Sequence, residues 1–148
     1  MQLSQEGLCL IKAHEGLSLT PYTCPAGKLT IGYGHVVKQG EVIAENFNEF
    51  EAQRLLKADI STVERAIGRL VAVPLTQKQY DALVSLIFNI GVAAFANSTL
   101  RACLNRGNYT AAAREFLRWK FASGRVIEGL ARRRAAEMAI FKKNDKPS

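Results

Sequence analysis

The sequence predicts an α+β fold in which a small N-terminal lobe with a β-hairpin and an all-helical C-terminal lobe are joined by one long helix. Residues 18–33 hold two strand signals around a turn, residues 48–70 hold an unbroken apolar stripe at helical spacing, and short glycine-punctuated helical patterns follow. At 148 residues the chain suits a single domain. We place the β-containing lobe at 14–47, the linking helix at 48–70 and the helical lobe at 1–13 and 71–148.

The N-terminal lobe is expected to fold against the end of a first helix. Ser4 can cap this helix, which runs to about His14 and is ended by Gly16. Strands are predicted at residues 18–23 and 29–33, with a Pro/Gly turn between them, and a third short strand is predicted at residues 40–43.

The linking helix has a start signal, because Asn48 is a suitable N-cap and Glu51 follows three residues later. A helix of this length spans roughly 30 Å, enough to bridge two lobes, and a ligand is expected in a cleft between them. Its apolar positions recur at helical spacing: Leu56, Ile60, Val63, Ile67 and Leu70.

The helical lobe begins after Pro74, where Thr76 and Gln79 form a capping box for a helix that stops at Gly91. Further helices are predicted at about 97–107, 110–121 and 130–143. The inward positions of the helix after Thr76 are predicted to be Tyr80, Leu83, Val84, Ile87 and Phe88.

The composition excludes several classes of protein. No apolar run approaches the roughly 20 residues of a membrane-spanning helix, and the N-terminus lacks the regions of a signal peptide. Two histidines and three cysteines without CxxC spacing predict neither a metal cluster nor a disulfide framework. Cys9 and Cys103 lie at apolar helix positions and are expected to be buried, whereas Cys24, beside Pro25 in a turn, is expected to be reachable.

Positive charge is concentrated in the last third of a chain whose net charge is +7. Such a field favours polyanions, and charge alone does not choose between nucleic acid, anionic lipid and acidic wall polymers. The basic residues are Arg118, Lys120, Arg125, Arg132, Arg133, Arg134, Lys142, Lys143 and Lys146, against Glu128, Glu137 and Asp145.

Three reactive side chains lie around the predicted hairpin. Glu15, Cys24 and Thr30 stand nine and then six residues apart, and a hairpin that doubles back on its helix brings them around one small volume. This stretch resembles the active-site motif of the phage-type lysozymes, the endolysins of glycoside hydrolase family 24, which place a Glu, an Asp or sometimes a Cys, and a Thr at this spacing. The residues that match are Glu15-Gly16-Leu17, Tyr22, Cys24, Gly27 and Thr30-Ile31-Gly32-Tyr33-Gly34-His35, and a looser similarity covers nearly the whole chain.

The resemblance implies a lysozyme-like fold and hydrolysis with inversion at the sugar. Glu15 would be the general acid, kept protonated by an apolar setting, and Cys24 and Thr30 would position the attacking water. Most family members have Asp at the position of Cys24, and a thiol is mostly neutral at pH 7. Either a cation such as Lys28 favours the thiolate, or Cys24 holds water without a full charge, or it attacks the sugar itself. Without the motif, Glu15 would be a solvated or arginine-paired helix-end acid and Cys24 an ordinary turn cysteine.

The resemblance also implies residues that contact the sugar, although packing explains each of them as well. His35 is interpreted as structural, and one of Arg132, Arg133 and Arg134 is expected to reach Glu15. The implied substrate-binding residues are Val36, Phe88, Asn89 and Ser98.

Three functions follow as hypotheses. The first is a muramidase: an endolysin that hydrolyses the β-1,4 bond between N-acetylmuramic acid and N-acetylglucosamine in peptidoglycan. It would need no cofactor or metal, would act as a monomer without binding nucleic acid, and would wait in the host cytoplasm for a holin-made lesion. Its basic C-terminal region would contact anionic outer-membrane lipid. The second is a lytic transglycosylase, which uses one Glu and forms an anhydro product. The third, a nucleic-acid-binding helical protein, leaves the Glu15 motif unexplained.

Overall fold

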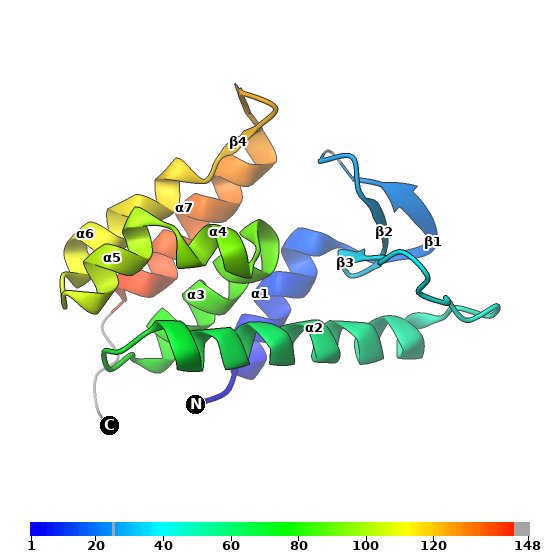
Figure 1. Ribbon diagram of the computed structural model, residues 1–148, viewed down its shortest axis with the longest axis horizontal. Helices are drawn as coiled ribbons and strands as arrows, with labels where there is room; N and C mark the ends of the chain where they lie inside the picture. Colours follow the sequence, from blue (N-terminus) through cyan, green and yellow to red (C-terminus); the bar gives the residue numbers. More distant parts are fainter. Residues whose placement is uncertain (25, 144–148) are drawn as a thin grey trace.

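A computed structural model describes residues 1–24 and 26–143 and confirms an α+β architecture of two lobes. Pro25, Asp145 and Lys146 lie outside these residues. A three-stranded antiparallel sheet stands at one end of the molecule, and the helices gather at the other (Figure 1). The strands of the sheet, in spatial order, are β1 (Ser18–Thr23), β2 (Leu29–Gly32) and β3 (His35–Val36).

The helices begin where their capping residues predict. Helix α1 (Gln5–Glu15) starts after Ser4, whose side chain accepts a hydrogen bond from Gly7 N, and it ends at Gly16. The start of the linking helix and the capping box of Thr76 and Gln79 are likewise confirmed. The remaining helices are α2 (Glu49–Leu70), α3 (Gln77–Ile90), α4 (Val92–Ala96), α5 (Thr99–Asn105), α6 (Tyr109–Glu115), the 3-10 helix η1 (Phe116–Arg118) and α7 (Glu128–Lys142).

Helix α3 forms the centre of the helical lobe. Every residue from Tyr80 to Ile87 is buried, because α1, α2, α4 and α7 all pack around this helix (Figure 1). A helix that is covered on all sides makes a rigid platform. Side chains from α3 and α7 therefore have fixed positions relative to the end of α1.

Helix α2 bridges the two lobes. Its apolar stripe is buried from Leu56 to Ile67. It contacts β2 and β3 of the sheet as well as α3 and α4 of the helical lobe. The sheet is thereby held beside the C-terminal end of α1.

The prediction of a third strand at residues 40–43 is wrong, because the third strand is His35–Val36 and residues 41–44 have no regular structure. Val42 is 90% exposed, so it has no apolar surface to pack against. Glu41 instead uses its carboxylate to accept hydrogen bonds from the backbone N–H of Lys38 and to bind His35. Two adjacent apolar residues without a surface to pack against were therefore not enough to form a strand.

The predicted helix at 110–121 is also wrong in its C-terminal part. The α-helix ends at Glu115, a 3-10 turn follows, and Phe121 lies in strand β4 (Phe121–Ala122). This strand pairs with β5 (Arg125–Val126) through a two-residue turn in which Ser123 and Gly124 both have positive φ. The hairpin and the five-residue helix α4 were not predicted.

Of the cysteines, Cys103 is buried and Cys24 is partly exposed, as predicted, but Cys9 is exposed. The inner side of α1 is formed by Gly7 and Ile11. Position 9 therefore points away from the packed side, and the prediction that its thiol is buried was wrong.

Candidate active site

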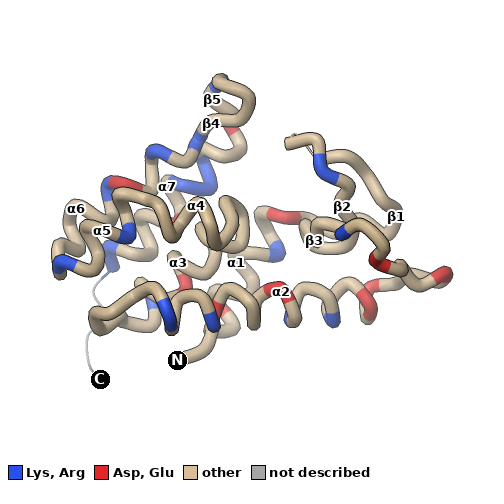
Figure 2. The backbone as a smooth tube through the Cα atoms, in the orientation of Figure 1, with Lys and Arg blue, Asp and Glu red and all other residues tan. Residues whose placement is uncertain are grey.

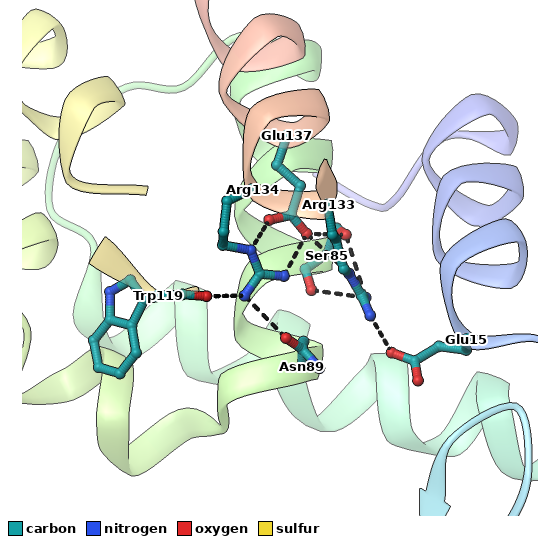
Figure 3. Close-up of polar contacts among 7 residues, drawn as sticks. All are labelled: Glu15, Ser85, Asn89, Trp119, Arg133, Arg134 and Glu137. Carbon is teal, nitrogen blue, oxygen red and sulfur yellow. Dashed lines mark hydrogen bonds and ion pairs between the residues drawn. The ribbon is translucent and has the colours of Figure 1, made fainter. Parts of the chain in front are cut away.

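Glu15 is the last residue of α1, and its side chain points toward the helical lobe. It is only 14% exposed, and its Oε2 lies 2.5 Å from Nη1 of Arg133 on α7 (Figure 3). One of Arg132, Arg133 and Arg134 was expected to reach this acid, and Arg133 is the one that does. A helix-end carboxylate that would otherwise rotate freely is thus fixed in one orientation.

Arg133 is itself held by a buried cluster on α3 and α7. Its Nε donates to Glu137 Oε2 at 3.2 Å, and its Nη2 donates to the carbonyl of Ser85 at 3.2 Å. The Ser85 hydroxyl donates to the same carboxylate of Glu137. The guanidinium group of Arg133 therefore binds Glu137 and Ser85 in the core through Nε and Nη2, and binds Glu15 through Nη1.

Arg134 completes the cluster on the other side of Glu137. Its Nε lies 2.7 Å from Glu137 Oε1, and its Nη1 donates to Asn89 Oδ1 at 2.9 Å and to the Trp119 carbonyl at 3.4 Å (Figure 3). Both Arg134 and Glu137 are 0% exposed. Burial raises the pKa of Glu137, while the adjacent guanidiniums of Arg134 and Arg133 oppose that rise.

Gly34 leaves the space that the Glu15 carboxyl group occupies. A β-carbon at position 34 would lie 2.9 Å from the carboxyl carbon of Glu15 and closer still to its Oε1. The backbone also has φ +71° there, which favours glycine. The turn between β2 and β3 therefore lies against Oε1 of the acid, whereas Arg133 binds Oε2.

Replacing Gly34 with alanine is expected to lower activity roughly 100-fold, because the methyl group pushes the Glu15 carboxyl out of place. A matched control is Gly40→Ala, which has the same strain at φ +82° but open space around the new methyl group. Both variants should lose about 1–2 kcal/mol of stability. The measurements are the clearing of peptidoglycan that the muramidase hypothesis expects, and thermal unfolding. Equal activity losses in the two variants would show that strain, and not contact with Glu15, is responsible.

Cys24 and Thr30 lie on the hairpin of the sheet. The N–H of Cys24 donates to the Lys28 carbonyl at 2.9 Å, which extends the β1–β2 ladder into the turn. Thr30 is 3% exposed, and its hydroxyl donates to the same carbonyl at 2.9 Å. Thr30 is paired with Tyr22 across the ladder.

The surroundings of the Cys24 sulfur favour the thiolate. Desolvation by burial is the largest single influence and acts to raise the pKa of Cys24. Hydrogen bonding, chiefly from the N–H groups of Lys28 and Ala26, outweighs it and lowers that pKa below its ordinary value of 9.0. Lys28 lowers the pKa of Cys24 through its backbone N–H, whereas its ammonium group was the candidate suggested by the sequence.

His35 fixes the sheet to the linking helix. Its Nδ1 lies 2.7 Å from Asp59 Oδ2 on α2, and its Nε2 lies 2.7 Å from Glu41 Oε2. The hydrogen bond to Asp59 raises the pKa of His35, burial opposes this, and Glu41 adds to the rise. These contacts agree with a structural interpretation of His35.

The four residues expected to bind sugar are spread over both lobes. Val36 is 42% exposed on β3, and Phe88 is half-buried against the core. Asn89 uses its Oδ1 to accept from Arg134. The Ser98 hydroxyl donates to the Phe95 carbonyl at 2.7 Å and caps α5. Their binding roles stay predictions.

A groove of about 570 Å³ lies elsewhere, between α1 and α2. Leu3, Leu8 and Ile60 are among its lining residues, and Glu15, Cys24 and Thr30 are not. The expected ligand cleft between the lobes therefore stays a prediction. Within the described ranges, no set of His, Cys, Asp and Glu side chains is grouped to hold a metal ion, and no helix is long and apolar enough to cross a bilayer.

The roles of several residues of the site were not predicted from the sequence. Glu137 and Ser85 act through Arg133, and Gly34, although it belongs to the motif, acts by leaving space, so none of them supplies a group to the expected reaction. Glu137 did have a signal, because an acid four residues after Arg133 lies on the same face of a helix.

The fold and the site together define a lysozyme-like enzyme, with an acid at the end of the first helix placed between a small sheet and a helical lobe. The chain belongs to the phage lysozyme family, whose family model matches residues 12–137. It is 45% identical over 147 residues to an endolysin of Acyrthosiphon pisum secondary endosymbiont phage 1, covering 95% of this chain and 98% of that protein.

Solved structures lead to the same family. A variant of P22 lysozyme is 46% identical and superposes with a TM-score of 0.80 over 97% of this chain and 99% of that chain. The muramidase domain of SpmX from Asticaccaulis excentricus is 37% identical with a TM-score of 0.84, over 97% of this chain and 99% of that domain. The protein is therefore an enzyme of the lysozyme class.

Proposed function

We propose that the protein is an endolysin that hydrolyses the β-1,4 bond between N-acetylmuramic acid and N-acetylglucosamine in peptidoglycan, for host cell lysis. The observation that carries the proposal is the placement of Glu15, which Arg133 and Gly34 hold at the junction of the two lobes, beside the hairpin of Cys24 and Thr30. Glycoside hydrolysis requires a proton donor and a second polar group. The proposal assigns the first part to Glu15 and the second to Cys24 with Thr30.

Glu15 acts as the general acid in this proposal. Its Oε2 is committed to Arg133, so Oε1, the oxygen beside Gly34, would carry the proton that passes to the leaving sugar oxygen. Once the proton has left, the carboxylate is stabilised by the guanidinium of Arg133. The buried cluster behind Arg133 keeps this stabilising charge in place without reorganisation during the reaction.

Cys24 and Thr30 position the water that attacks the anomeric carbon. A thiolate can accept a proton from that water, and the buried Thr30 hydroxyl can hold its oxygen. A sulfur in this setting can also attack the sugar directly, which would give a covalent intermediate. The two routes differ in stereochemistry, because single displacement inverts the anomeric centre and double displacement retains it.

The proposal is tested by the clearing of purified peptidoglycan, followed by mass spectrometry of the released muropeptides. Hydrolysis adds a water, so the fragments should carry reducing ends. Anhydro ends, one water lighter, would identify the protein as a transglycosylase instead. Retention on DNA that weakens with salt, without wall clearing, would favour the third hypothesis.

The thiol of Cys24 is expected to contribute a rising limb to the pH–rate profile, because its ionised form activates water. As hydrogen bonding lowers the pKa of Cys24, this limb should lie below the pH at which a free thiol ionises. The pH–rate profile of Cys24→Ser should lack this rising limb, and the variant should clear peptidoglycan roughly 10–100-fold more slowly. Cys24→Asp should move it to lower pH by several units, since an Asp ionises near pH 4.

The matched control is Cys9→Ser, which removes the exposed thiol of α1 and should leave the profile unchanged. In that background, the rate of alkylation by iodoacetamide against pH reports the ionisation of Cys24, since Cys103 is buried. If Cys24→Ser retained both the rate and the limb, the thiol would be a bystander.

Peptidoglycan is the proposed partner, and the described structure narrows the surface that could contact anionic lipid. Lys and Arg positions, drawn in blue, lie along α7 and in the β4–β5 hairpin (Figure 2). Of the basic residues in the last third of the chain, Arg133 and Arg134 are buried, and Arg118 and Arg132 pair with acids on their own helical turns. Among the described residues of this basic set, contact with anionic envelope lipid would therefore depend on the cations that remain, Lys120, Arg125, Lys142 and Lys143. Release from the host cytoplasm through a holin-made lesion completes the proposed role.

A further inference from the structure

Tyr22 shares a face of the sheet with the two proposed water-positioning residues. It is paired with Thr30 across the β1–β2 ladder and stands two residues before Cys24. Partners across an antiparallel ladder project to the same face, as do residues two apart along an extended chain. Thr30 is 3% exposed and Tyr22 is 39% exposed. Tyr22 is therefore the most exposed member of this group.

The phenol also lies within range of two negative charges. Burial raises the pKa of Tyr22, and the charges of Glu15 and Cys24 raise it further. Tyr22 thus stands on the same face of the sheet as Thr30, and charge on Glu15 and on the thiol acts on its phenol oxygen. Its O–H therefore keeps its proton across the neutral range.

We propose that Tyr22 is a substrate-positioning residue, whose ring packs against the sugar at the cleaved bond and whose O–H donates a hydrogen bond to an oxygen of that sugar. The proposal rests on the proposed function. The ring offers an apolar surface beside two reactive groups, and sugars present C–H faces and oxygen acceptors together. A neutral donor suits this place, because a cation there would pair with Glu15 and compete with Arg133.

The activity test compares Tyr22→Phe, Tyr22→Ala and the control Tyr109→Phe on soluble, uncross-linked glycan fragments. Tyr22→Phe keeps the ring and should lower kcat/KM about tenfold, the equivalent of one hydrogen bond, with an unchanged melting temperature. Tyr22→Ala should lower it about 100-fold. Tyr109→Phe removes a hydroxyl that donates to the Pro74 carbonyl in the helical lobe and should leave kcat/KM unchanged. Wild-type kcat/KM in Tyr22→Phe would overturn the proposal.

A second measurement does not depend on turnover. The titration of Tyr22, followed by NMR of its labelled ring, should move to lower pH in Glu15→Gln, because a neighbouring negative charge has been removed. An unmoved titration would show that the phenol does not face the acid and would also overturn the proposal. If Glu15→Gln retained full activity, the proposed function would fail, and the titration would still report where Tyr22 lies.

Discussion

The Glu15→Gln variant is expected to clear peptidoglycan roughly 10²- to 10⁴-fold more slowly than the wild type, which is the contribution of a positioned general acid. Glutamine has nearly the same shape, and its amide oxygen can still accept from Nη1 of Arg133. The variant therefore keeps the site assembled but has no proton to transfer. The initial rate of turbidity loss at neutral pH is the measurement.

A matched control for this variant is Glu49→Gln. Glu49 is an exposed acid at the start of α2 that accepts a hydrogen bond from the Tyr33 hydroxyl at 3.4 Å, so its replacement removes a carboxylate near the sheet without touching the site. It should clear walls at the wild-type rate. A Glu15→Gln protein that kept more than about a tenth of the activity would remove Glu15 as the acid.

Replacing Glu137 with glutamine is expected to cost about 3–5 kcal/mol of stability, because two buried guanidiniums lose the carboxylate between them. For a chain of this size, the melting temperature should fall by roughly 10 °C or more. Activity measured well below that temperature should also fall, since Arg133 no longer has a fixed position from which to hold Glu15. Calorimetry and wall clearing on the same samples are the measurements.

The control for Glu137→Gln lies on the same helix. Glu128 and Arg132 form an i,i+4 pair on α7, as Arg133 and Glu137 do, but their side chains are 85% and 70% exposed. Glu128→Gln should change stability by no more than about 0.5 kcal/mol, because water screens the pair. A similar loss in both variants would mean that charge at any position on α7, and not the buried cluster, stabilises the protein.

The starts of the main helices could be predicted because capping is a local signal. Ser4, Asn48 and Thr76 each accept a hydrogen bond from the backbone N–H three residues later, so the whole signal lies within four consecutive residues. The motif around Glu15 was recognisable for a similar reason, since its three reactive residues and its glycines lie within about twenty positions.

The parts that were missed depend on distant contacts. Arg133 and Glu15 are 118 residues apart, so which arginine binds the acid is decided by how α7 packs on α3. The short hairpin β4–β5 was overlooked although Ser123-Gly124 is a turn sequence, because two-residue strands have no measurable alternation. The incorrect prediction of a strand at residues 40–43 shows the opposite error. The local sequence favours a strand there, but these residues have no apolar surface to pack against.

The anchoring of Glu15 has a mechanical consequence. Through Arg133 the acid belongs to the rigid helical lobe, whereas Cys24 sits at the tip of the sheet, beyond the turn at Gly34 that touches the acid. A rotation of the sheet about that turn would displace the thiol more than the carboxyl group, because the thiol lies further from the turn. A change in the tilt of the sheet would therefore alter the distance between the thiol and the carboxyl group, while Arg133 keeps the acid in place on the helical lobe.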